Sequence, residues 1–391
     1  MKFNALIIPA AVFAVLFSCS RPSILPENNW NPAVHEALTG MIEREGILSE
    51  NYDPECRPYA VFDYDNTTVM NDISLTLMIY QIENLRYAFS PEDAFGCFTA
   101  WLPDLDKVLD GPGMSARMIG QDLAADYKAL RQMLDDGKTL DLIHCTDEYL
   151  DFRAKLEGLN EGVENSFDYG TWCMWQPSLF NGMTWEELQD LTRESVDWWL
   201  GQGNIVTERW DSPDGRISVE VMKGLALPQE SIHLYKALQD NGFDVYICSA
   251  SLEAVVEAMA CSPRYGLGLS PDNVFGIRLA DRNNFGGPFD ESYDQTFLDG
   301  KTECIRKLIA PRHGGKAPSL VAGDSNGDYA MLTSFDSLSV GLIIDCKRSG
   351  PIAKLAEEAS TSSMKDCSGR PVYVLQQRDL TIPGYVKERD V

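Results

Sequence analysis

The stretch YAVFDYDNT, residues 59–67, decides the fold of this chain. Its first four residues are apolar or aromatic, a run typical of a short strand buried in a parallel sheet. Asp63 and Asp65 follow at the point where that strand would end. Because the carboxyl ends of parallel strands open into one crevice, we expect a functional site beside these two aspartates.

Four later apolar runs repeat the pattern of a buried strand. They span residues 243–248, 319–322, 338–344 and 371–375, the last as a candidate edge strand. Between them, apolar residues recur at helical spacing over residues 231–239, 252–260 and 301–309. Strands that alternate with helices predict an α/β fold whose core is a parallel, Rossmann-like sheet.

Residues 71–227 differ in character from the segments on either side. Methionine, tryptophan and acidic residues dominate there, and helical runs such as 185–199 replace the β-branched runs. We therefore expect a helical cap domain at 71–227, inserted into a core made of residues 19–70 and 228–391. A cap in this position would cover the crevice at the end of the sheet and select the substrate.

Further polar residues stand at the other strand and helix boundaries. Ser249 follows the second strand, Lys301 opens a helix, and GDSNGD at 323–328 follows a later strand. Carboxylates gathered at one crevice repel each other unless a hard cation lies between them, and oxygen ligands select Mg²⁺. A cation, a lysine and a hydroxyl donor around an aspartate suit the transfer of a phosphoryl group.

The order of these motifs, D-x-D-x-T, a strand-terminal Ser, a Lys and G-D-x-x-x-D, resembles that of the haloacid dehalogenase-like (HAD) hydrolases. The resemblance covers most of the chain after about residue 50. It implies a HAD-like core in which Asp63 is the nucleophile and forms an aspartyl-phosphate. Asp65 would then protonate the leaving oxygen and later activate water.

The same resemblance assigns the groups that hold the phosphate and the metal. The phosphate would be held by Ser249, Lys301, Asn66 and Ala250. The Mg²⁺ ion would be held by Asp63, the main-chain carbonyl of Asp65 and Asp324, with support from Asp328.

Asp65 also narrows the reaction type. A halide ion leaves without a proton, whereas an alkoxide leaving a phosphate ester benefits from a nearby acid, so Asp65 favours phosphomonoester hydrolysis over dehalogenation. Phosphotransfer to a second alcohol uses the same residues and stays open as an alternative. A lipoprotein that binds a ligand without catalysis also stays open, because intact motif residues do not prove an assembled site.

The residues of the expected cap indicate which class of substrate the protein binds. The stretch 168–184 and the lead-in Arg57-Pro58-Tyr59 resemble secreted bacterial phosphorylcholine phosphatases, within a branch that looks like phosphoserine phosphatase. That branch implies that Asp72 binds the ammonium group of the substrate. Clustered aromatic residues can enclose a quaternary ammonium, although helical spacing assigns most of those in the cap to its core. They are Tyr169, Trp172, Trp175, Trp185, Trp198 and Trp199. We expect a small amino- or choline-bearing phosphate ester as substrate: phosphocholine, phosphoethanolamine or phosphoserine.

Two local patterns compete with this interpretation or add to it. Arg312-His313-Gly314 mimics the nucleophile motif of histidine acid phosphatases, but it lies late in a chain with only four histidines.

Cys346 and Cys367 bracket a polar, Ser-rich loop and form a candidate disulfide pair.

The charge of the chain excludes one class of partner. It carries 33 Lys and Arg against 59 Asp and Glu, a formal net charge of −26. So acidic a surface repels a phosphate backbone, and we expect no nucleic-acid partner. The sequence leaves the oligomeric state open.

The N-terminus indicates export. Residues 5–17 are apolar behind Lys2, but they span only about half of a membrane-crossing helix. Leu16-Phe17-Ser18-Cys19 resembles the lipobox of bacterial lipoproteins, which implies a signal peptide at 1–18 and acylation of Cys19. We therefore expect an exported protein that is anchored to a bacterial membrane through this lipid alone.

Overall fold

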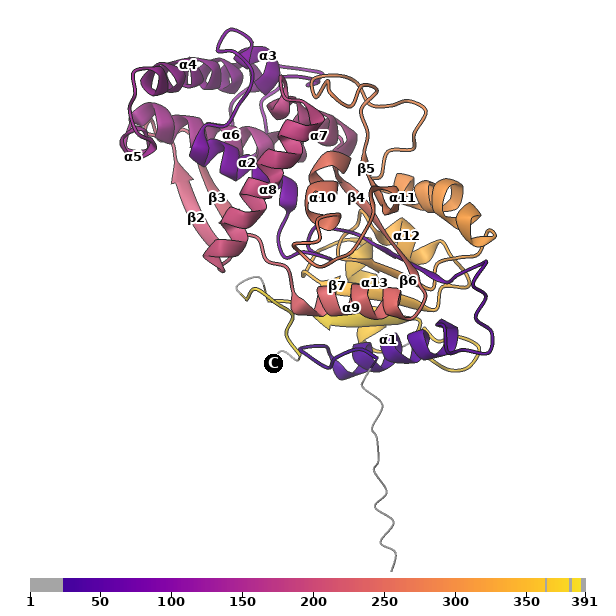
Figure 1. The fold of residues 1–391 in the computed structure, drawn as a ribbon. Helices are drawn as coiled ribbons and strands as arrows, with labels where there is room; N and C mark the ends of the chain where they lie inside the picture. Colours follow the sequence, from indigo (N-terminus) through magenta and orange to yellow (C-terminus); the bar gives the residue numbers. More distant parts are fainter. Residues whose placement is uncertain (1–23, 363, 380–381, 388–391) are drawn as a thin grey trace, which may run out of the picture.

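The computed structural model describes residues 24–362, 364–379 and 382–387. The expected signal peptide at 1–18 and its lipidation site Cys19 lie outside these residues. The described chain forms two lobes, a core and a cap (Figure 1). No helix among the described residues has both the length and the apolar character to cross a membrane.

The core is built on a six-stranded sheet in which every neighbouring pair of strands is parallel. The strand order is β5-β4-β1-β6-β7-β8. The strands are β1 Tyr59–Phe62, β4 Asp244–Leu252, β5 Val274–Ile277, β6 Leu320–Gly323, β7 Val340–Asp345 and β8 Tyr373–Gln377. Val61 of β1 pairs with Tyr246 on one side and with Val321 on the other. This sheet confirms the α/β, Rossmann-like core predicted from the sequence.

Helices cover both faces of the sheet. Side chains alternate between the faces of a strand, so Ala60 and Phe62 face one layer while Tyr59 and Val61 face the other. The first layer contains α1 Pro32–Glu45, α9 Gln229–Asp240 and α10 Glu253–Ala260. The second contains α11 Asp299–Cys304 with its continuation Ile305–Ile309, α12 Tyr329–Thr333 and α13 Pro351–Ser360. The sheet is therefore buried on both sides, which leaves its carboxyl end as the place for a site.

The cap is made from the segment between β1 and α9. Its helices are α2 Ile73–Asn84, α3 Ala94–Phe98, α4 Ala116–Asp135, α5 Leu140–Ile143, α6 Asp147–Ser166, α7 Tyr169–Trp175 and α8 Trp185–Gln202, with a 3₁₀ turn at Gln176–Phe180. Buried aromatic side chains at the centre of the cap pack edge to face, among them Phe98 against Phe89 and Tyr127. These helices form the upper lobe of Figure 1.

The cap is not wholly helical, which differs from the expectation for 71–227. β2 Val206–Asp211 and β3 Ser218–Lys223 form an antiparallel hairpin. The turn contains Pro213-Asp214-Gly215, with Gly215 at a φ of 70°. A Pro-Asp-Gly turn between two short runs of alternating polar and apolar residues is typical of a β-hairpin. It was overlooked because the tryptophan-rich segments before it have a helical pattern.

The chain passes from core to cap and back at one place. Met70 and Ala226 form an antiparallel bridge, with N–H···O distances of 2.7 and 3.2 Å. Next to it, the Asn71 amide donates to the carbonyls of Met222 and Gly224 at 3.1 and 2.9 Å. The two connections are thus tied together beside the boundaries expected at residues 71 and 227.

Candidate active site

Asp63, Lys301 and Asp328 form a buried ion cluster at the carboxyl end of the sheet. Lys301 Nζ donates to Asp63 Oδ1 and to Asp328 Oδ1, each at 2.6 Å. All three side chains are buried. Burial makes an unpaired charge costly, and the two carboxylates that contact the Lys301 ammonium stabilise it there.

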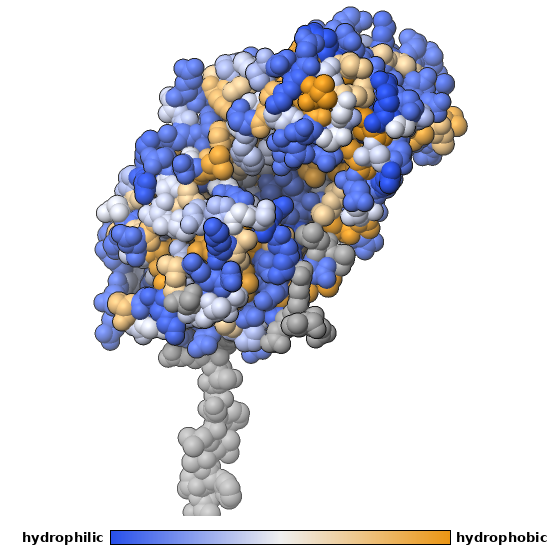
Figure 2. Space-filling model, turned by 180° about the vertical axis from the view of Figure 1, so that it is seen from behind, coloured by the Kyte–Doolittle hydropathy of each residue, from blue (hydrophilic) through white to orange (hydrophobic). Residues whose placement is uncertain are grey.

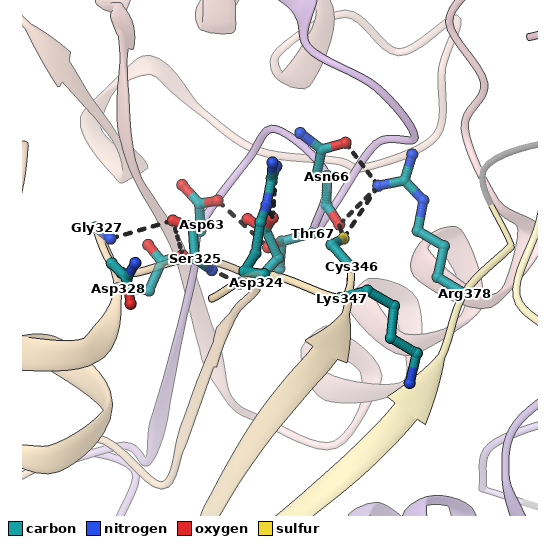
Figure 3. A network of polar contacts seen from close by, with 12 residues as sticks. Asp63, Asn66, Thr67, Asp324, Ser325, Gly327, Asp328, Cys346, Lys347 and Arg378 are labelled. Carbon is teal, nitrogen blue, oxygen red and sulfur yellow. Dashed lines mark hydrogen bonds and ion pairs between the residues drawn. The ribbon is translucent and has the colours of Figure 1, made fainter. Parts of the chain in front are cut away.

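Asp328 is held in place by the loop that precedes it. Its Oδ2 accepts hydrogen bonds from the main-chain N–H groups of Asp324 and Ser325 and from the Ser325 hydroxyl, all at 3.0 Å. Figure 3 shows Asp63, Asp324, Ser325 and Asp328 gathered in this way. Gly323 is required here, because a Cβ atom on it would lie 2.4 Å from the Cβ of Asp328.

The geometry of the carboxylates fits a divalent cation. Asp63, Asp324 and Asp328 each offer a carboxylate oxygen within 4.8 Å of the others. Among the described residues, this is the one group of three or more acidic, His or Cys side chains placed so that they could share a metal ion. Burial and the charge of Asp328 raise the pKa of Asp63 to about 8, although the charge of Lys301 acts in the opposite direction. Burial and Asp328 likewise raise the pKa of Asp324 to about 6. A hard cation between them would relieve this repulsion, and three carboxylate oxygens are ligands that Mg²⁺ accepts.

Asp65 is turned away from this group toward the cap. Its Oδ1 accepts from the N–H of Ile73 at 2.6 Å, and its Oδ2 accepts from the Ser251 hydroxyl at 2.7 Å. Burial, followed by the nearby charges of Asp72 and Asp63, raises the pKa of Asp65 well above its usual value. A carboxyl group that keeps its proton at neutral pH can act as a general acid.

Asn66 occupies the turn after β1. It has a φ of 58°, and its Oδ1 accepts from Arg378 Nη1 at 2.6 Å. Figure 3 shows this contact beside Cys346, whose Sγ also lies 3.5 Å from Arg378 Nη1. Cys346 and Cys367 are both free thiols, so the disulfide expected between them is not formed. Arg378 thus positions Asn66, a contribution that the sequence did not indicate.

Ser249 lies deeper than expected because β4 continues past it to Leu252. The Ser249 side chain is fully buried, and its hydroxyl accepts from the N–H of Ser251 at 3.0 Å. Ala250 and Ser251 line the cavity above it. Ser251, which was not predicted, lines this cavity and donates its hydroxyl to Asp65, whereas Ser249 is not among the described residues that line it.

A cavity of about 300 Å³ brings core and cap residues together. The core contributes Asp63, Asp65, Asn66, Ala250, Ser251, Lys301, Asp324 and Arg348, among others. The cap contributes Asp72, Glu164, Tyr169, Trp172 and Gln176. Seen from behind, the surface between the two lobes is hollowed and hydrophilic (Figure 2).

The cap wall of this cavity is acidic and aromatic. Asp72 lies at the N-cap of α2, where its Oδ1 accepts from the N–H of Leu75 at 2.9 Å. The rings of Tyr169 and Trp172 pack with centroids 5.4 Å apart. Trp175, in contrast, is core, because its side chain is buried and its indole N–H donates to Phe98 O at 2.7 Å.

His313 belongs to the core and not to this cavity. Its Nε2 lies 2.9 Å from the Tyr246 hydroxyl and its Nδ1 2.9 Å from Arg57 O, while its ring stacks on Tyr59. With both ring nitrogens engaged and its side chain buried, it is placed as a structural residue and not as a nucleophile.

Comparison with known proteins shows that part of this chain is similar to a phosphatase. No family model matches the chain. Phosphorylcholine phosphatase of Pseudomonas aeruginosa is 29% identical over 175 residues, which are 39% of this chain and 48% of the relative. The chain thus matches about half the length of that relative, and the resemblance to phosphorylcholine phosphatases is confirmed over this part.

One solved structure shows the same fold over nearly the whole chain. A conserved protein of unknown function from Anaerococcus prevotii is 28% identical with a TM-score of 0.84, covering 94% of this chain and 98% of that one. A phosphoserine phosphohydrolase-like protein from Francisella tularensis is 14% identical with a TM-score of 0.33, covering 74% of this chain and 87% of that one.

Proposed function

We propose that this protein is a Mg²⁺-dependent phosphomonoester hydrolase that forms an aspartyl-phosphate on Asp63. The observation that carries the proposal is the cluster of Asp63, Lys301, Asp324 and Asp328 beside a cavity that also holds Asp65. The similarity to a phosphorylcholine phosphatase supports the same reaction class.

Each residue of the site would have a separate role in the reaction. Asp63 would attack the phosphorus atom, and the Lys301 ammonium at its Oδ1 would stabilise the charge on the transferring group. Mg²⁺, when held by Asp63, Asp324 and Asp328, would neutralise charge on the phosphoryl oxygens. Asp65 would give its proton to the leaving alcohol and then, as a carboxylate, accept a proton from the attacking water.

We propose a small substrate whose alcohol carries an amino or trimethylammonium group. Asp72 and Glu164 give the cap wall negative charge, and Tyr169 and Trp172 give it aromatic surface. Aromatic faces and carboxylates attract quaternary ammonium groups. A cavity of about 300 Å³ suits a small ligand.

A substrate panel tests this function. Phosphate release would be measured with phosphocholine, phosphoethanolamine, phosphoserine and glucose 6-phosphate, each with Mg²⁺ and with a chelator. We expect Mg²⁺-dependent release with preference for the cationic esters. Absence of release from every ester would refute the hydrolase, whereas equal rates on all four would refute only the cationic preference.

We also propose that the protein is exported and anchored through a lipid on Cys19. The support is the sequence alone: an apolar segment at 5–17 whose last residues begin the motif Leu16-Phe17-Ser18-Cys19. A substrate that reaches the cell from outside would then be hydrolysed before uptake.

A further inference from the structure

Arg348 binds one of the three metal-site carboxylates from the solvent side. Its Nε and Nη2 lie 3.3 and 3.2 Å from Asp324 Oδ2. The Arg348 side chain is 47% exposed, whereas that of Asp324 is 3% exposed. A partly exposed guanidinium therefore contacts a buried carboxylate that lines the cavity.

This contact differs in kind from the one made by Lys301. Lys301 is 3% exposed and is held by two buried carboxylates at 2.6 Å. Arg348 follows β7 in a loop, and its guanidinium forms an ion pair with Asp324. Moving Lys301 would leave a buried ammonium away from its carboxylates, whereas the guanidinium of Arg348 reaches water when it leaves Asp324. The cost of that step falls on the buried Asp324 carboxylate, and an incoming cation would offset it.

Asp324 is also needed by the cation of the proposed function. One of its oxygens lies within 4.8 Å of oxygens of Asp63 and Asp328. An ion at that position and the guanidinium would both draw on the negative charge of the same carboxylate, and the two cations would repel each other.

The cap offers Arg348 another set of partners. Asp72 and Glu164 line the same cavity as Arg348 and Asp324. A guanidinium that leaves Asp324 thus stays in an acidic environment and does not have to be expelled from the site.

We propose that Arg348 is an exchangeable counterion of Asp324, which binds this carboxylate in the metal-free protein and moves away when a divalent cation binds. The inference rests on the metal site of the proposed function. Its consequence is that Arg348 lowers the affinity for the metal, so that it acts as a positioning residue for Asp324 and not as a catalytic residue.

The test is a titration of chelator-stripped protein with Mg²⁺ by isothermal calorimetry, which reads metal binding without any substrate. Arg348→Gln removes the competing charge and keeps a polar side chain, so we expect the Kd to fall about three- to tenfold. Arg348→Lys keeps the charge but not the planar fork, and it should give a smaller change in Kd.

Lys347→Gln is the matched control. Lys347 is 57% exposed and pairs with Asp345, so its substitution removes the same formal charge one position away. We expect its Kd for Mg²⁺ to remain within about twofold of wild type. Melting temperatures of all variants in chelator would show that each is folded.

An unchanged or higher Kd in Arg348→Gln would overturn the inference, because a purely structural Arg348 would support the site and its loss would weaken binding. A structure with Mg²⁺ in which Arg348 still contacts Asp324 would overturn it as well. Failure of the proposed function would look different: the protein would bind Mg²⁺ in the titration but release no phosphate from any ester.

Discussion

Lys301 and Asp63 are 238 positions apart in the chain, yet the Lys301 ammonium donates to the Asp63 carboxylate at 2.6 Å. The contact exists because β1 lies between β4 and β6, so that Asp63 follows the central strand of the sheet. α11 then delivers Lys301 to the same end. The strand order therefore brings distant segments of the chain together at the site.

Asp65→Asn should separate esters by their leaving group. Asparagine cannot donate the proton that an alkoxide needs, so turnover of phosphocholine should fall by about 10²–10⁴-fold. p-Nitrophenolate leaves without a proton, so p-nitrophenyl phosphate should be much less affected in the first step. Steady-state and burst kinetics on both esters measure this difference. Equal losses in the burst phase on both esters would show that Asp65 is not the acid.

Asp72→Asn should weaken the binding of cationic substrates. Asparagine caps a helix as well as aspartate does, so α2 should stay intact while the charge on the cap wall is lost. We expect the KM for phosphocholine to rise about three- to tenfold and the KM for glucose 6-phosphate to stay unchanged.

The matched control for this prediction is Asp168→Asn. Asp168 caps α7 through the N–H of Thr171 at 3.0 Å, and in the described structure it is not among the residues that line the cavity. It should leave both KM values near wild type. If both variants raise the KM for phosphocholine alike, the effect belongs to cap stability and not to Asp72.

The stabilisation by Mg²⁺ should depend on pH. Folding raises the pKa of Asp63 to about 8 and that of Asp324 to about 6, both from an ordinary value of 3.8. Between the unfolded and folded values the native state holds extra protons, so the metal-free protein loses stability as pH rises through this window. Mg²⁺ must displace those protons below the folded values, and its effect should grow toward higher pH.

Thermal denaturation with and without Mg²⁺ at about pH 5 and about pH 8.5 measures this dependence. We expect a rise in melting temperature of a few degrees at the higher pH and little change at the lower one. A larger effect of Mg²⁺ at the acidic pH would mean that these carboxylates are not its ligands.

Cys19→Ser should release the protein from membranes. Without the thiol there is no acylation site, and the acidic folded domain has no charge attraction to an anionic bilayer. Fractionation of cells and immunoblotting would follow the protein. Membrane association that survives the substitution would exclude the lipid anchor.

The parts of the fold that could be predicted are those with a strong local signal. Tyr59–Phe62 is a continuous apolar run with polar residues behind it, and the structure has a strand with these bounds. β5, Val274–Ile277, was missed because its four residues include Gly276, which shortens the apolar pattern. That glycine is needed, since a Cβ there would lie 2.5 Å from the Cα of Glu253.

The residues of the candidate site likewise include some that could be predicted from the sequence and some that could not. Asp63, Lys301, Asp324 and Asp328 stand in motifs, so their meeting could be expected from strand order. Arg348 and Arg378 could not be found, because a single arginine in a C-terminal loop carries no pattern and its role depends on where the loop folds. Ser249 was expected just after its strand, whereas β4 continues to Leu252, because the end of a strand cannot be fixed from the sequence.

The most direct test of the central claim is to trap the phosphorylated protein. Enzyme mixed with ³²P-labelled phosphocholine and Mg²⁺ would be quenched in acid, digested and mapped by mass spectrometry. The account predicts a base-labile acyl-phosphate on the peptide that contains Asp63, and its absence in Asp63→Asn. Label on a histidine such as His313 in a parallel sample quenched in base, or phosphate release by Asp63→Asn at the wild-type rate, would contradict it.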